Sequence, residues 1–307
     1  MSRTTADLGF AQLKNPLMPA SGCFGWGREY SQLFDLKILG AVVTKAVTPE
    51  PRAGNPGPRV AETPAGMLNA IGLQNSGLAG ALNEELPWLH KQEVPILVNV
   101  AGRTEDDYVK VAEALAGQDL LGLELNLSCP NVREGGITFG TDAAGVYRLV
   151  SRVKGVCPLP LTVKLTPNIT DITEPALAAE EAGASALTLI NTLRGMAIDI
   201  DTKRPLLGNI TGGLSGPAIK PVALALVWQA AKVVTIPIIG CGGIACVEDV
   251  IEFLLAGAAA VQVGSATFAA PLLLPTLVAQ LGRWLEQENT SVQELVGAAH
   301  RQGGNHD

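Results

Sequence analysis

The sequence predicts a parallel α/β fold, with a (β/α)8 TIM barrel as the preferred arrangement and a doubly wound sheet as the alternative. Short, β-branched, nearly all-apolar runs recur along the chain and alternate with helical patterns. The runs do not alternate polar with apolar residues, which indicates strands buried on both faces of a parallel sheet. Because eight such runs fit within 307 residues, we expect a single barrel domain over residues 1–307.

The elements can be placed in order along the chain. Strands are predicted at residues 15–20, 40–47, 95–100, 122–127, 161–165, 186–191, 236–241 and 260–264, and helices at 104–116, 142–154, 174–182, 217–233, 246–256 and 271–286. Thr104 and the three acidic residues after it are typical of a helix start, and glycine follows several helices, as at a C-terminal cap. The Pro-, Gly- and Asn-rich segment 49–94 exceeds an ordinary βα connection, so we expect an insertion that decorates the barrel mouth.

Composition excludes several classes of protein. With 47% hydrophobic and 17% charged residues the chain has material for a large core, whereas disorder needs the opposite balance. A net charge of −7 without a Lys/Arg block argues against nucleic acid as a partner. The most apolar stretch, residues 222–240, is interrupted by Lys232 and Pro237 and fails as a membrane span. The first residues lack the apolar core of a signal peptide, and we expect a cytoplasmic protein.

Five cysteines, at positions 23, 129, 157, 241 and 246, form no CxxC pair. An odd count without such spacing suits neither a disulfide framework nor a metal or iron–sulfur site. We therefore expect no metal in this chain, and any cysteine chemistry would depend on one thiol acting alone.

Polar residues gather where the predicted strands end, which in a (β/α)8 barrel is the face that carries the active site. The strand ends carry Ser21, Lys45, Asn99, Asn126, Cys129, Lys164, Asn191, Thr192, Gly242, Gly243, Gly264 and Ser265. Lysine on a solvated strand face would be unremarkable, but parallel barrel strands have no such face. An unpaired buried ammonium is costly, so Lys45 and Lys164 are predicted to face an anionic ligand or an electron-rich cofactor.

Glycine-rich segments follow the last two predicted strands, GCGGI at 240–244 and VGSA at 263–266. Either could be an ordinary turn. Together, in the last two βα positions, they favour a phosphate site in which backbone N–H groups approach the anion, with the Ser265 hydroxyl as a further donor.

Asparagines form a third group of candidates at the same face: Asn69, Asn99, Asn126, Asn131 and Asn191. Asparagine is common in turns and helix caps, but Asn99 and Asn126 each end an apolar run without an obvious turn. A primary amide offers two donors and an acceptor, so several amides together can match a heterocycle that carries N–H and C=O groups.

Cys129 lies in the segment NLSCPN, directly after the fourth strand. The usual fate of a free cysteine is an inert buried thiol. Its polar neighbours, and the glycine-rich segment 132–141 that could cover a site, favour a general base instead. The histidines, at 90, 300 and 306, are in segments unsuited to a Cys–His nucleophile pair.

As a set, these motifs closely resemble class 1 dihydroorotate dehydrogenases, the FMN-containing barrel enzymes of pyrimidine synthesis. The resemblance runs from Asn15 to about Pro275 through PASGCFGWGREY, TKAVT, NAIGLQN, NLSCPN, VKLTPN, INTLRGMAIDI, GGLSGPAIKP, GCGGI and VGSA, in family order. It implies an FMN site made of Ser21, Lys45, Ala46, Asn99, Asn126, Lys164, Ile190, Gly216, Gly242, Gly243, Gly264 and Ser265. It implies dihydroorotate contacts at Lys45, Asn69, Ala70, Ile71, Gly72, Leu73, Asn126, Asn131, Asn191 and Thr192.

The resemblance also implies a reaction and a partner. Cys129 matches the family's base, which removes the C5 proton of dihydroorotate as hydride passes from C6 to FMN. The motifs resemble the NAD-linked B type, in which two copies of this chain join subunits that carry FAD and a [2Fe-2S] cluster in a heterotetramer. The fumarate-linked A type, an FMN barrel acting on another dihydropyrimidine, and a non-enzymatic barrel that binds a phosphorylated ligand remain alternatives.

Overall fold

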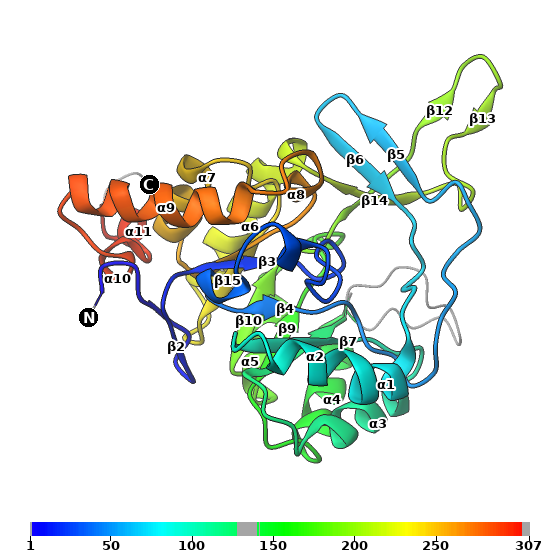
Figure 1. Ribbon diagram of the computed structural model, residues 1–307, viewed down its shortest axis with the longest axis horizontal. Coiled ribbons are helices and arrows are strands. Elements are labelled where there is room, and N and C mark those ends of the chain that lie inside the picture. The colour runs from blue at the N-terminus through cyan, green and yellow to red at the C-terminus, as the bar shows by residue number, and fades with distance from the viewer. Residues whose placement is uncertain (1, 128–139, 141, 303–307) are drawn as a thin grey trace.

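The computed structural model describes residues 2–127, 140 and 142–302. Eight parallel strands curl into a barrel at its centre (Figure 1). They are β3 (Leu17–Pro19), β4 (Val42–Val43), β7 (Ile96–Val100), β8 (Gly122–Asn126), β9 (Leu161–Lys164), β10 (Ala186–Leu189), β15 (Ile238–Cys241) and β16 (Ala258–Val263). Each of the eight predicted runs contains or overlaps one of these strands, and the predicted barrel is confirmed.

The strands follow the chain around the barrel in the order β3-β16-β15-β10-β9-β8-β7-β4. The ladder between β3 and β4 is reduced to a close contact, in which the Gly40 N–H donates to the Leu17 carbonyl at 2.9 Å. Glycine is needed at position 40 because a Cβ there would collide with the Asn15 carbonyl. Every residue of β7 and β8 is buried, which explains why these strands are nearly all-apolar in sequence.

Helices cover the outside of the barrel. Those after the third to the eighth strands are α3 (Glu105–Leu115), α4 (Ala143–Lys154), α5 (Thr173–Glu181), η4 (Pro217–Ile219) with α6 (Lys220–Ala231), α7 (Val247–Leu255), and α8 (Ala266–Ala269) with α9 (Leu273–Gln287). The predicted helices lie within a few residues of these bounds, and Thr104 caps α3 by accepting from the Asp107 N–H. Short helices also lie near the two ends of the chain: η1 (Tyr30–Gln32), η2 (Leu36–Ile38), α10 (Val292–Leu295) and α11 (Ala298–Gln302).

The segment 49–94 contributes both to the barrel wall and to the barrel mouth, whereas the sequence predicted only a contribution to the mouth. Its second half forms α1 (Gly77–Gly80), the π-helical η3 (Ala81–Glu85) and α2 (Leu86–His90), which together supply the barrel helix between β4 and β7. Only the first half decorates the mouth, through β5 (Val60–Thr63) and β6 (Gly66–Asn69). The expectation of a wholly decorative insertion was therefore wrong for the second half.

A four-stranded antiparallel sheet, which we call the mouth sheet, extends β5 and β6 with two strands from the connection after β10 (Figure 1, upper right). These are β11 (Leu193–Gly195) and β14 (Gly212–Ser215), separated by a hairpin of β12 (Ile198–Asp199) and β13 (Arg204–Pro205). Its register pairs Asn69 with Gly213, so the sheet fixes Asn69 beside the residues that follow β10. The remaining strands, β1 (Ala6–Asp7) and β2 (Gln12–Leu13), form a small hairpin near the N-terminus.

Among the described residues, no helix has both the length and the apolar character needed to cross a bilayer.

Candidate active site

Two adjoining cavities, of about 300 Å³ and about 80 Å³, lie where the barrel strands end and the mouth sheet begins. Ser21, Lys164 and Asn191 line both of them. The other expected site residues that line one or both cavities are Lys45, Ala46, Asn69, Ala70, Ile71, Gly72, Leu73, Asn99, Asn126, Ile190, Thr192, Gly216, Gly242, Gly243, Gly264 and Ser265. Every expected site residue that the structure describes is therefore at this one place.

Cys129 and Asn131, with the expected cover at 132–139 and 141, lie outside the described residues. Their assignment as base and substrate contact stays a prediction.

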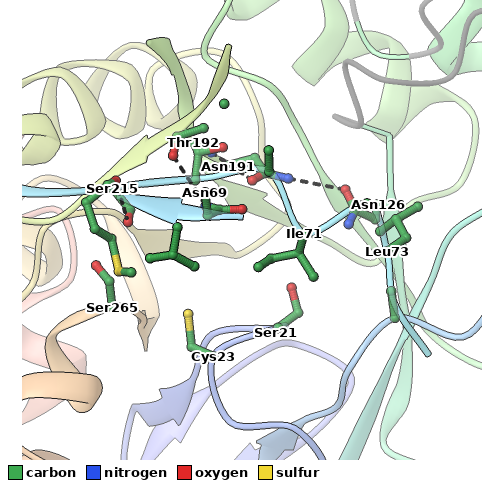
Figure 2. A pocket seen from close by; sticks show the side chains of 18 of the residues that line it. Ser21, Cys23, Asn69, Ile71, Leu73, Asn126, Asn191, Thr192, Ser215 and Ser265 are labelled. Atoms are coloured by element: carbon green, nitrogen blue, oxygen red, sulfur yellow. Dashed lines mark hydrogen bonds between the residues drawn. The ribbon is translucent and has the colours of Figure 1, made fainter. Parts of the chain in front are cut away.

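Amide side chains from β7, β8 and the connection after β10 are linked at the larger cavity, and Figure 2 shows the contact between Asn191 and Asn126. Asn191 Nδ2 donates to Asn126 Oδ1 at 3.2 Å, and Asn126 Nδ2 donates to Asn99 Oδ1 at 3.5 Å. The Asn126 carbonyl accepts from the Tyr108 hydroxyl of α3 at 2.7 Å, which holds the end of β8 in place. The amides are thus positioned relative to one another by the protein itself, as recognition of a planar polar ring requires.

Lys164 is only 3% exposed and lies in the wall between the two cavities. Its Nζ donates to Gln262 Oε1 at 2.9 Å and lies 3.5 Å from Ser21 Oγ and 4.0 Å from Glu124 Oε1. Burial lowers the pKa of Lys164, but its interactions with the Cys241 thiol and the Glu124 carboxylate outweigh burial, and the pKa is raised overall. The lysine therefore presents a positive charge to both cavities.

Lys45 follows β4 rather than lying within it, because the strand ends at Val43. Its backbone N–H donates to the Gly25 carbonyl at 2.9 Å, and its side chain lines the larger cavity. Lys45 therefore lies where the sequence expected a ligand, and its contact with that ligand stays a prediction. Its expected place within a strand was wrong.

Two further thiols line the cavities, Cys23 after β3 and Cys241 at the end of β15. Burial raises the pKa of Cys23 to about 12 and also raises the pKa of Cys241. Both are neutral thiols near neutral pH, which fits their interpretation as packing residues and leaves them unsuited to act as bases.

Comparison with known proteins identifies the family. The family model for dihydroorotate dehydrogenase matches residues 5–285. The chain belongs to the dihydroorotate dehydrogenase family. A relative from Geobacillus kaustophilus (strain HTA426), named "Dihydroorotate dehydrogenase B (NAD(+)), catalytic subunit", is 54% identical over 305 residues, covering 99% of this chain and 97% of the relative. Relatives of the same name come from Bacillus caldolyticus, 53% identical with 99% and 97% covered, and Listeria monocytogenes serotype 4b (strain F2365), 54% identical with 96% and 98% covered.

The chemistry of the cavity walls fits the FMN that the family resemblance implies. Glycines and a hydroxyl, Gly242, Gly243 and Ser265, line the smaller cavity, as a phosphate group requires. The larger cavity is lined by amides, including Asn99 and Asn126, which can match the polar edge of a flavin ring or an orotate ring. Lys164 stands between the two, where a cation can act on a ring that gains negative charge when it is reduced.

The loop after β15 needs glycine for geometric reasons. Gly242 and Gly243 have φ values of 134° and 76°, in a region that other residues rarely adopt. A Cβ at Gly243 would also lie 2.8 Å from the backbone nitrogen of Lys220, at the start of α6. The loop therefore packs against α6 with only its backbone facing the smaller cavity.

Gly243→Ala is accordingly expected to weaken FMN binding by about tenfold or more, because the loop must shift and carry its N–H groups with it. Titration of the FMN-free chain with FMN, followed by flavin fluorescence, measures the effect. Gly117→Ala is the matched control, since a Cβ there meets nothing within 4 Å. Equal affinities for the two variants would contradict the role of this loop.

The sequence interpretation missed the polar groups behind the cavity wall. Glu124 and Gln262 are fully buried within β8 and β16, and Thr188 within β10. Of these, the Glu in LLGLEL and the Gln in AVQVG were visible as single polar letters in apolar runs. Arg194 and Phe268 also line the larger cavity. Arg194 lies within the motif INTLRGMAIDI but was given no role, and Phe268 lies outside every quoted motif.

Proposed function

We propose that this chain oxidises (S)-dihydroorotate to orotate in pyrimidine biosynthesis, with FMN bound in the two cavities. One observation carries the proposal. Every described residue that is expected to contact FMN or dihydroorotate lines one of two adjoining cavities at the barrel mouth. Membership of the dihydroorotate dehydrogenase family, and relatives named for this activity over nearly the full chain, support it.

We assign different groups of residues to the FMN phosphate, the flavin ring and dihydroorotate, according to where each group lies. The glycine loops after β15 and β16, together with Gly216 and Ser265, hold the phosphate, while Lys45, Asn99, Asn126 and Lys164 hold the flavin ring. The segment from Asn69 to Leu73, carried in part by the mouth sheet, joins Asn126, Asn191 and Thr192 in holding dihydroorotate. All of these line the cavities, and the linked amides of Asn191, Asn126 and Asn99 support the proposal that substrate and flavin contacts form one unit.

The reaction removes a proton from C5 of dihydroorotate and a hydride from C6, so that a C5=C6 double bond forms. FMN supplies the hydride acceptor. Cys129 is proposed as the base for the C5 proton, on the resemblance of NLSCPN to the family motif. Asn126 and Asn131 are proposed to orient the ring, and Lys164 favours the step electrostatically because negative charge arises beside it.

We further propose that electrons leave the chain for NAD⁺ through a partner subunit that holds FAD and a [2Fe-2S] cluster, in a heterotetramer built on a dimer of this chain. The relatives named "B (NAD(+)), catalytic subunit" support this proposal. The chain's own cysteine spacing provides no iron–sulfur motif, which is why both groups are assigned to the partner.

A comparison of electron acceptors tests this assignment. The purified chain, supplied with dihydroorotate, is expected to reduce NAD⁺ only after addition of the electron-transfer subunit of a B-type relative, and not to reduce fumarate at a comparable rate. Rapid fumarate reduction by the chain alone would instead assign it to the A type. Turnover of dihydrouracil in preference to dihydroorotate would move the substrate to another dihydropyrimidine.

A further inference from the structure

A buried polar cluster lies directly behind the cavity wall. Its centre is Glu124 of β8, whose side chain has no exposure to solvent. Glu124 Oε1 accepts from Asn99 Nδ2 at 2.7 Å, and Oε2 accepts from Thr188 Oγ1 at 2.8 Å and Gln262 Nε2 at 2.5 Å. Three donors on two oxygens are what an ionised carboxylate needs when it is removed from water.

The cluster follows the layering of the barrel. Glu124, Thr188 and Gln262 come from β8, β10 and β16, which are alternate strands, and none of them lines either cavity. Asn99 and Lys164 come from β7 and β9, in the intervening set, and both line the larger cavity. Alternate strands of such barrels fill successive layers of the interior. Glu124 therefore lies one layer beneath the residues that face the ligands.

Two connections lead from Glu124 to that upper layer. Gln262 bridges it to Lys164, since its Nε2 donates to the carboxylate and its Oε1 accepts from Lys164 Nζ at 2.9 Å. Asn99 carries the other connection, on to Asn126 and Asn191. The carboxylate is also close enough to Lys164, at 4.0 Å, to balance its charge.

We infer that Glu124 is a positioning residue, which keeps Lys164 charged and aimed at the flavin and fixes the amides that hold the rings. The inference rests on the proposed function, because it places FMN beside Lys164. Without Glu124, Lys164 would be a buried cation without a counter-charge, and such a group gives up its proton rather than remain charged.

Other charged or titratable groups near Lys164 do not replace Glu124. Among the described residues, its titratable neighbours are Glu124 from β8, Cys241 from β15 and Cys23 from the loop after β3. Burial raises the pKa of both thiols above the ordinary range, that of Cys23 to about 12, so both are neutral near neutral pH. Loss of Glu124 therefore lets the pKa of Lys164 fall, with the lysine charged at lower pH and neutral at higher pH.

The test measures FMN affinity of the full-length FMN-free chain by flavin fluorescence, at about pH 6.5 and about pH 8.5, both below the raised pKa of either thiol. We expect Glu124→Gln to weaken FMN binding by about tenfold at the higher pH and by less at the lower pH, relative to the unaltered chain under the same conditions. Thr162→Val is the matched control, because Thr162 is the register neighbour of Glu124 on β9 and its buried hydroxyl has no hydrogen-bond partner. It should bind FMN as the unaltered chain does.

The Glu124→Gln substitution in a chain that also carries Lys164→Met distinguishes a positioning role of Glu124 from a merely structural one. If Glu124 acts through Lys164, then Glu124→Gln should change affinity by less than about twofold once Lys164→Met is present. The double variant should also unfold at a higher temperature than Lys164→Met alone, since that single change leaves the carboxylate buried and unpaired. Equal losses in both backgrounds, or a loss that does not depend on pH, would overturn the inference.

Three further outcomes have different consequences. If Glu124→Gln does not fold, Gln262→Met, which removes the bridge while keeping side-chain volume, should weaken binding in the same direction, and unchanged binding there would overturn the inference. If the unaltered chain does not bind FMN at all, the proposed function fails, and the inference fails with it. Normal binding by both the unaltered chain and Glu124→Gln would overturn the inference alone.

Discussion

Cys129→Ala is expected to leave FMN bound and to slow flavin reduction by dihydroorotate about 10²–10⁴-fold, the usual contribution of a positioned general base. The hydride cannot leave C6 at the normal rate unless the C5 proton is also removed, and alanine has no group to accept it. Because FMN contacts are assigned to other residues, the flavin spectrum of the variant before substrate is added should be unchanged.

Anaerobic stopped-flow absorbance of the bound flavin measures this effect directly. Cys157→Ala is the matched control, since Cys157 is also a free thiol but is buried between α4 and β9 and lines neither cavity. Cys129→Ser should retain part of the rate, because a hydroxyl can accept the proton but ionises far less readily than a thiol. Reduction of Cys129→Ala flavin at the control's rate would remove Cys129 from the role of base.

Lys164→Met is expected to lower FMN affinity and to lower the midpoint potential of the flavin that remains bound. The ammonium lies in the wall between the smaller and the larger cavity at 3% exposure, where a charge is screened little by water. Loss of a cation beside a ring that becomes negative on reduction makes the ring harder to reduce. Removing one partner of a buried pair should also cost about 3–5 kcal/mol of folding free energy.

Flavin content after purification, a redox titration and thermal unfolding together measure these effects. Lys110→Met serves as the control, because Lys110 is an exposed lysine whose pair with Glu50, at 3.4 Å, is on the surface. A Lys164→Met chain with the flavin content, potential and unfolding temperature of the control would show that the lysine does not act on the flavin.

The barrel was predictable because its signal is local. Strands buried on both faces are nearly all-apolar, and the five buried residues of β7 and of β8 keep this pattern apart from Asn99, Glu124 and Asn126. The mouth sheet was not predictable in the same way. Asn69 and Gly213 pair across 144 residues, and β14 consists of Gly-Gly-Leu-Ser, a sequence with low strand propensity.

In the site, too, features with a local sequence signal were predictable and features that depend on long-range contacts were not. Lys164 was identified because a lysine in an apolar strand needs a partner, and that argument pointed to a ligand. The structure adds a second partner, Glu124, whose contact with Lys164 depends on Gln262, 138 residues away from Glu124 in the chain. Such long-range contacts leave no periodic pattern in sequence. The assignment of Cys129 came from the motif NLSCPN and its family resemblance, and it stays a prediction.

The most direct test of the central claim is the visible spectrum of the purified chain, recorded anaerobically before and after addition of dihydroorotate. We expect a yellow protein whose flavin absorbance bleaches on mixing, with one orotate formed for each flavin reduced. A yellow protein that dihydroorotate does not bleach would contradict the assigned substrate, and a colourless chain that takes up no added FMN would contradict the flavin site itself.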